Sequence, residues 1–136
     1  MGLFKKKPYK MNVNDYNRLV MYDNLYMDGR TAVILGWKAL KDYSGKDAVR
    51  YEKLCKENIA QFYEWIQEGE RHPDFVRPIQ VDAYTNLAKL YEKQARYSEA
   101  VGICSEALGE GITYDGTAGG MKKRLDRLVL KQAKNQ

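Results

Sequence analysis

The sequence predicts an all-α protein, and three observations support that prediction. Apolar residues recur every three or four positions through most of the 136-residue chain, which is the spacing of amphipathic helices. No stretch of more than a few residues alternates apolar and polar side chains, as a half-buried strand does. Glycines, serines and the 3 prolines lie mostly between the periodic segments, where they end helices. We therefore expect antiparallel helical hairpins joined mainly by short loops.

Length and composition are those of a single globular domain. A chain of this size buries roughly two thirds of the surface that its unfolded form exposes, and its 44% apolar and 30% charged residues are ordinary proportions. The net charge of +5 is concentrated at the two ends, residues 1–10 and 121–136, while the middle is net negative. We expect residues 1–12 to form a basic flexible lead and residues 13–136 to form one helical domain.

The N-terminal half is predicted to hold three of about six helices. The first begins near residue 13 and ends at Asp28-Gly29, a dipeptide that favours turns. The second spans about residues 30–43 and is apolar over much of its circumference, so we expect it to be buried. The third runs from about residue 46 to 68, because apolar residues repeat there at helical spacing without a breaker.

The C-terminal half is predicted to hold three shorter helices. Two prolines make residues 69–78 the clearest loop of the chain. Helices follow at about residues 79–94 and 98–108, and a glycine-rich turn then leads to the last helix at residues 118–134. We expect this last helix to cap the domain, with its cations facing water.

Residues 81–109 resemble one tetratricopeptide repeat. In such a hairpin small residues let two antiparallel helices approach closely, and bulky residues fill the space on either side. Two departures are that Cys104 replaces a large aromatic residue and that the closing proline is absent. The resemblance implies a right-handed superhelical bundle of hairpins, in which a degenerate first repeat is expected over residues 16–40. The matching residues are Tyr84, Leu87, Ala88, Tyr91, Tyr97, Ala100, Ala107 and Leu108.

The same resemblance implies a ligand-binding face on the helix at residues 79–94. Its side away from the partner helix carries acid, amide, hydroxyl and ammonium groups, which can hold an extended peptide or a terminal carboxylate. Asn86 and Lys89 lie mid-helix and are the first candidates, although a merely solvated helix face remains open as an alternative. The expected peptide-binding residues are Asp82, Thr85, Asn86, Lys89 and Lys93.

A second, weaker candidate is an anion site at the start of the last helix. Gly119 and Gly120 precede Lys122 and Lys123, and free amides at a helix N-terminus attract anions. No nucleotide-binding spacing accompanies them, so an ordinary turn is the alternative.

The chain offers little support for catalysis or metal binding. Cys55 and Cys104 lie in apolar helical patterns, and the only histidine, His72, lies in a predicted loop. We expect two buried reduced cysteines, a solvated histidine, no metal, no cofactor and no enzyme activity. No apolar run approaches the length of a membrane span, and residues 114–125 resemble the end of short bacterial tetratricopeptide-type proteins. These features together predict a cytoplasmic bacterial protein.

The predicted function is therefore that of a non-catalytic adaptor, which binds a peptide or a partner protein in a groove between the third and fourth helices. Two alternatives remain. Trp37, Trp65 and several tyrosines exceed what one small core can hide, which favours a homodimer. The basic ends, residues 1–10 and 121–134, would suit a nucleic-acid accessory protein, although they carry few aromatic residues. We do not expect membrane binding.

Overall fold

The computed structural model describes residues 12–135, and this part of the chain contains five α-helices and no strand. The all-α prediction is confirmed. The predicted basic lead at residues 1–12 lies outside the described residues except for Asn12, whose side chain accepts a hydrogen bond at the start of the first helix. The helices are α1 (Val13–Ala39), α2 (Lys46–Gly69), α3 (Asp82–Lys93), α4 (Tyr97–Gly109) and α5 (Gly120–Lys134).

The predicted break at Asp28-Gly29 is wrong, because α1 runs without interruption through both residues. Gly29 faces α2, where a Cβ atom would collide with the side chains of Asn58 and Gln61. Asn58 is buried there and its Nδ2 donates to the carbonyl oxygen of Tyr26 at 3.0 Å. The glycine thus permits a close approach of two helices, and this packing outweighs the roughly 1 kcal/mol by which glycine disfavours a helix.

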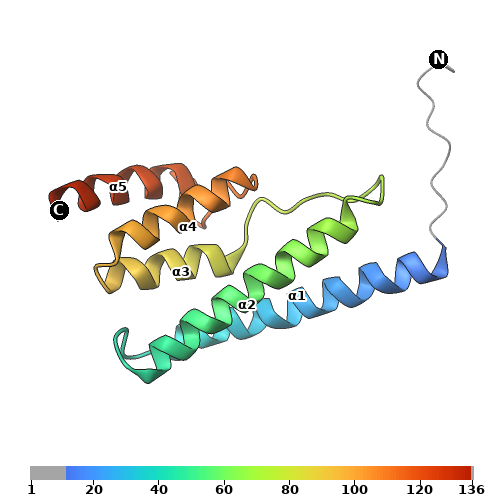
Figure 1. Cartoon of the computed structure of the whole chain (residues 1–136), viewed down its shortest axis with the longest axis horizontal. Coiled ribbons are helices and arrows are strands. Elements are labelled where there is room, and N and C mark those ends of the chain that lie inside the picture. Colours follow the sequence, from blue (N-terminus) through green and yellow to red (C-terminus); the bar gives the residue numbers. More distant parts are fainter. Residues whose placement is uncertain (1–11, 136) are drawn as a thin grey trace, which may run out of the picture.

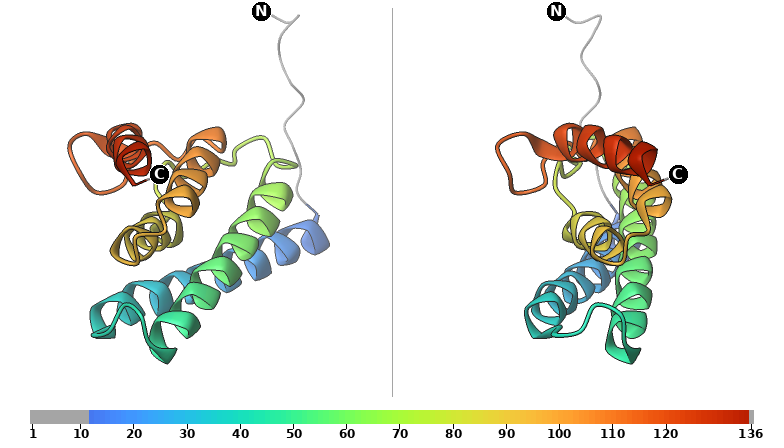
Figure 2. Two further views of the ribbon diagram at one scale, coloured as in Figure 1. Left: turned by 60° about the vertical axis from the view of Figure 1, so that its left-hand side comes forward. Right: turned by 90° about the vertical axis from the view of Figure 1, so that its left-hand side faces the viewer.

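The five helices form a long hairpin with a three-helix stack on one part of it (Figures 1 and 2). α1 and α2 are antiparallel, and the segment 70–81 carries the chain back along α2 to the start of α3. α3 packs on α1, α2 and α4, whereas α5 packs on α4. One hydrophobic core runs through the whole assembly and draws buried residues from every helix.

The hairpin of α3 and α4 buries six of the eight side chains on which the family resemblance rests. Its turn is a left-handed helix end, with Ala95 at φ 58°. The amide of Arg96 donates to the carbonyl oxygen of Tyr91 at 2.8 Å, and that of Ala95 donates to Glu92 at 3.0 Å, which together satisfy the last carbonyls of α3. The buried residues of this set are Tyr84, Leu87, Ala88, Tyr91, Ala100 and Ala107.

The expectation that all cations of the last helix face water is wrong for Arg124. This side chain is buried, and its Nε donates to Oδ2 of Asp115 at 2.8 Å. Asp115 also accepts from the amide of Thr117 at 3.0 Å, so it ties the glycine-rich turn to α5. Arg127 and Lys131 both pair with Glu92 of α3. Ion pairs therefore hold α5 to the bundle, in addition to the packing of its apolar face.

His72 is buried rather than solvated, contrary to the prediction. The chain turns sharply after α2, where the amide of His72 donates to the carbonyl oxygen of Gly69 at 2.8 Å. This turn brings the ring of Phe75 against that of Trp65, with their centroids 5.3 Å apart. The loop thereby folds over the end of α2, and His72 within it is only 5% exposed.

Both cysteines are free and buried, as predicted. Burial raises the pKa of the Cys55 thiol to about 12 and that of Cys104 to about 11. No helix among residues 12–135 is long and apolar enough to cross a membrane.

Candidate functional site

The five residues predicted to form a peptide-binding face on α3 do not share an exposed side. Thr85 and Asn86 are only 5% and 8% exposed, so the expectation that they face solvent is wrong. Asp82 and Lys89 are half-buried, and Lys93 alone is exposed.

The second half of α1 covers this side of α3, because α1 continues past residue 29 instead of ending there. Arg30 donates to Asp82 across the contact at 2.9 Å. Asn86 donates from Nδ2 to the hydroxyl oxygen of Tyr51 on α2 at 3.1 Å. The carboxylate of Asp82 and the amide of Asn86, which were expected to hold a peptide, are thus engaged within the fold.

Lys89 and Lys93 remain at the edge of this contact, where each ammonium group lies over an aromatic ring. The Nζ atom of Lys89 is 6.0 Å from the ring centroid of Trp37, and that of Lys93 is 4.9 Å from the ring centroid of Tyr43. Such contacts orient a cation without neutralising it.

Lys93 borders an open polar hollow between the α1–α2 loop and the α3–α4 turn, which we call the cationic hollow. Its volume is about 610 Å³. A second hollow of about 420 Å³ lies on the other side of Lys93, next to Lys89, Glu92 and Lys131. The residues that line the cationic hollow are Lys41, Asp42, Tyr43, Ser44, Lys93, Gln94 and Arg96.

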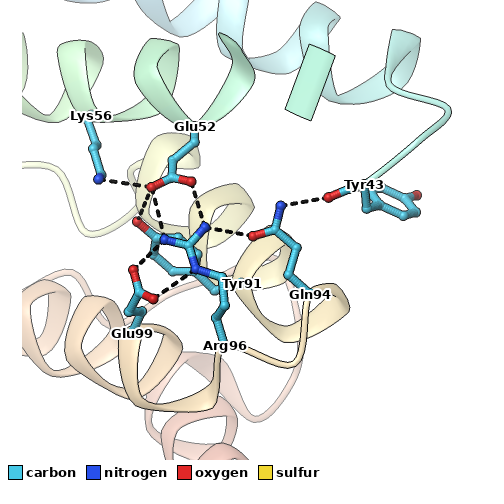
Figure 3. A network of polar contacts seen from close by, with 7 residues as sticks. All are labelled: Tyr43, Glu52, Lys56, Tyr91, Gln94, Arg96 and Glu99. Carbon is cyan, nitrogen blue, oxygen red and sulfur yellow. Dashed lines mark hydrogen bonds and ion pairs between the residues drawn. The ribbon is translucent and has the colours of Figure 1, made fainter. Parts of the chain in front are cut away.

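A polar network fixes the floor of the cationic hollow (Figure 3). Glu52 reaches from α2 to Arg96 in the α3–α4 turn, with two nitrogen–oxygen distances of 2.7 and 3.2 Å. Gln94 accepts from Arg96 at 2.8 Å and donates to the carbonyl oxygen of Tyr43 at 2.6 Å, which connects the turn to the α1–α2 loop. The hydroxyl of Tyr91 donates to Glu52 at 3.0 Å. The α1–α2 loop and the start of α2 are therefore held to the α3–α4 turn, which lies 44–51 residues further along the chain.

The network leaves the lysines, and not the arginine, as the available positive charges. Hydrogen bonds from Arg96 hold the pKa of Glu52 at about 2, well below its usual value. Carboxylates of Glu99 and Glu52 raise the pKa of Arg96 in turn, so the guanidinium charge is already balanced. Within the described residues neither Lys41 nor Lys93 forms an ion pair with a carboxylate.

Asp42, the one acid among the described residues that line the hollow, is engaged by its own loop. Its Oδ1 accepts from the amide and the hydroxyl of Ser44, both at 2.9 Å. The amide hydrogen bond, followed by that of the hydroxyl, lowers the pKa of Asp42. The hollow thus offers two unpaired ammonium groups beside one carboxylate.

Sequence reasoning missed Lys41, because it placed this residue inside a helix that was expected to run to residue 43. In the structure α1 ends at Ala39 and Lys41 lies in the following loop. No pattern along the chain connects Lys41 to Lys93, since only the tertiary fold brings the two together.

The predicted anion site at the start of α5 is partly occupied by internal contacts. The amide of Gly120 donates to Thr117 at 3.1 Å, and the next amide along, that of Met121, donates to Thr113 at 2.9 Å. Lys122 pairs with Asp126 at 2.7 Å. Gly119 and Lys123 lie beside each other at this end, but the two first amides of the helix are not available to an anion.

The cationic hollow has the chemistry of a binding surface for carboxylates. Ammonium groups donate charge-assisted hydrogen bonds to such groups, and a fixed floor lowers the entropy lost on binding. In the described part of the chain no group of three His, Cys, Asp or Glu side chains is placed to hold a metal ion. Comparisons with models of known families, with curated proteins and with solved structures found no match to the chain.

Proposed function

We propose that this protein is a non-catalytic adaptor that binds an acidic segment of a partner protein at the cationic hollow. The observation that carries the proposal is the pair of unpaired cations, Lys41 and Lys93, on either side of a hollow whose floor is fixed by Arg96 and its partners. Lys89 extends the same positive edge along α3. Of the five residues expected from the sequence to bind a peptide, the proposal keeps Lys89 and Lys93, and it adds Lys41.

Electrostatics sets the expected strength of this binding. Each exposed ion pair contributes about 0.2–1 kcal/mol, so three lysines alone give weak attraction. A solvent-exposed site is screened by salt, with a Debye length of about 8 Å at physiological ionic strength. We therefore expect affinity that depends strongly on salt and that rises when the partner adds apolar contacts around the hollow.

The tetratricopeptide resemblance of residues 81–109 supports this proposal at the level of the scaffold. We propose that the α3–α4 hairpin is one repeat of this type, within a bundle that follows the same superhelical packing. Such hairpins present rigid helix faces to peptides. Two unpaired buried cysteines favour a reducing compartment, so the proposal includes action in a bacterial cytoplasm.

A charge-reversal experiment tests the proposal with a matched control. The test variant carries Lys41→Glu and Lys93→Glu, and the control carries Lys53→Glu and Lys134→Glu at two exposed sites away from the hollow. Both variants change the net charge equally. The probe is a fluorescein-labelled peptide of eight consecutive glutamates, and its fluorescence anisotropy is measured at 50 mM and 500 mM NaCl.

We expect the wild type and the control to bind the peptide at low salt and the test variant to bind at least tenfold more weakly. Equal binding by the test and control variants would show that the hollow is not the binding site, because the net charge of the protein alone would then explain the attraction of the peptide. Tighter binding of a single-stranded oligonucleotide of equal charge would instead support the nucleic-acid alternative.

A further inference from the structure

α1 carries a line of exposed apolar residues. α1 lies at the edge of the bundle, beside α2 and α3 (Figure 2). Met21, Leu25 and Leu35 are 48%, 44% and 59% exposed. Ala32 and Ala39 continue the same line and are also exposed.

The spacing of this stripe is that of a helix–helix seam. Its positions are separated alternately by four and three residues, the repeat that keeps side chains on one line between two paired helices. The one polar position on the line is Asp28, which is exposed and for which the structure shows no ion pair within the described residues. The full line is Met21, Leu25, Asp28, Ala32, Leu35 and Ala39.

We propose that a second copy of this chain covers the stripe, with the two α1 helices antiparallel and a two-fold axis at residue 30. A two-fold axis requires a surface that complements itself. About this point Leu25 of one copy faces Leu35 of the other, and Met21 faces Ala39. Asp28 faces Ala32, so every large side chain of the stripe meets an apolar one.

A hollow at the C-terminal end of the stripe supports this alignment. It has a volume of about 360 Å³ and is lined by Gly36, Ala39 and Leu40 at the end of α1 and by Asp47, Arg50, Tyr51 and Leu54 of α2. In the proposed dimer the side chain of Met21 from the second copy lies opposite this hollow. Methionine is flexible and fills irregular apolar gaps well, so one knob meets one hole at each end of the seam.

The size of the seam predicts a weak dimer. From Met21 to Ala39 the stripe is roughly 27 Å long at 1.5 Å per residue, and one helix face buries less than the roughly 1,200 Å² of a stable complex. We expect a dissociation constant on the order of 10 µM. Asp28 limits the affinity, because the two copies of this acid lie about four residues, or roughly 6 Å, apart along the seam.

Sedimentation equilibrium between 1 and 300 µM protein tests the proposal. We expect a monomer–dimer equilibrium that Leu35→Glu weakens by more than tenfold, while the control Leu130→Glu, at a leucine of similar exposure on α5, leaves it unchanged. Asp28→Ala should tighten the dimer by roughly fivefold, and a misfolded variant would not give that gain. Monomer at all concentrations for both the wild type and Asp28→Ala would overturn the proposal.

Cysteine cross-linking tests the antiparallel alignment. We expect an equimolar mixture of Leu25→Cys and Leu35→Cys chains to be joined by a short bis-maleimide, because these positions face each other. Either variant alone should not cross-link, since equal positions lie ten residues, or roughly 15 Å, apart along the seam. The native cysteines are buried and do not compete. Cross-linking of each variant alone would refute the alignment.

This dimer does not depend on the adaptor function. Leu35→Glu should leave glutamate-peptide binding unchanged at protein concentrations below the dimerisation range. The two proposals can therefore fail separately.

Discussion

Replacing Gly29 with alanine tests the close contact between α1 and α2 on which the five-helix arrangement depends. Alanine favours a helix over glycine by about 1 kcal/mol, so an open site in mid-helix gains stability from this change. At Gly29 the added methyl group would instead overlap the side-chain amides of Asn58 and Gln61. Gln61 is half-buried and can move aside, whereas Asn58 is 1% exposed and holds the carbonyl oxygen of Tyr26.

The expected magnitude follows from these two contacts. Overpacking a well-filled contact costs about 1–3 kcal/mol, and losing the buried hydrogen bond of Asn58 costs about 1–3 kcal/mol more. These costs exceed the gain in helix propensity. We therefore expect Gly29→Ala to lower the free energy of unfolding by at least about 1 kcal/mol.

Urea unfolding followed by circular dichroism at 222 nm measures the effect, with Gly102→Ala as the matched control. Gly102 lies within α4, and a Cβ atom there would have no neighbour within 4 Å. The control should raise the unfolding midpoint, while Gly29→Ala should lower it, each by roughly 0.5 M for a slope of about 2 kcal/mol/M. If both variants were stabilised equally, the close contact of α1 with α2 would not be the reason that α1 tolerates a central glycine.

Three further predictions concern polar side chains that are engaged within the fold. Because the folded-state pKa of Glu52 is lowered to about 2, its contribution to stability is complete above its unfolded value near 4.5 and is lost as the pH falls toward 2. Urea midpoints at pH 7 and pH 2.5 should therefore differ less for Glu52→Gln than for the wild type, and an equal difference would contradict this role. Asn86→Ala should lower the free energy of unfolding by about 1–3 kcal/mol, since it removes a buried donor to Tyr51, and thermal unfolding that matches the wild type would show that the contact is dispensable. Arg124→Ala should cost about 3–5 kcal/mol in urea unfolding, because it leaves the carboxylate of Asp115 buried without its partner, and a loss below 1 kcal/mol would mean that the carboxylate is solvated.

Much of the fold was predictable from local patterns. α2 begins at Lys46 as expected and ends at Gly69, because its apolar face repeats without a breaker and glycines stand at both ends. The α3–α4 hairpin was predictable because small residues such as Ala88 and Ala100 mark where two helices can approach. Both are fully buried.

The errors share one physical cause, which is that a local signal was overruled by a distant partner. The sequence around Gly29 predicts the end of a helix, but close packing against α2 favours a helix that continues through this residue. Asn86 reads as a solvated polar residue, yet the hydroxyl of Tyr51 satisfies it inside the bundle. His72 reads as a loop residue in water, and Phe75 closes the loop above the end of α2.

The candidate site could be predicted only in part. The sequence by itself determined the helical class, the apolar faces and the presence of cations on α3, because these depend on side-chain chemistry and on the 3.6-residue period of a helix. Only the tertiary structure decided which cations stay accessible, since the course of α1 covers Asn86 and leaves Lys93 at the edge. It also brought Lys41 of the α1–α2 loop and Lys93 at the end of α3 to one hollow, although no local pattern connects the two residues.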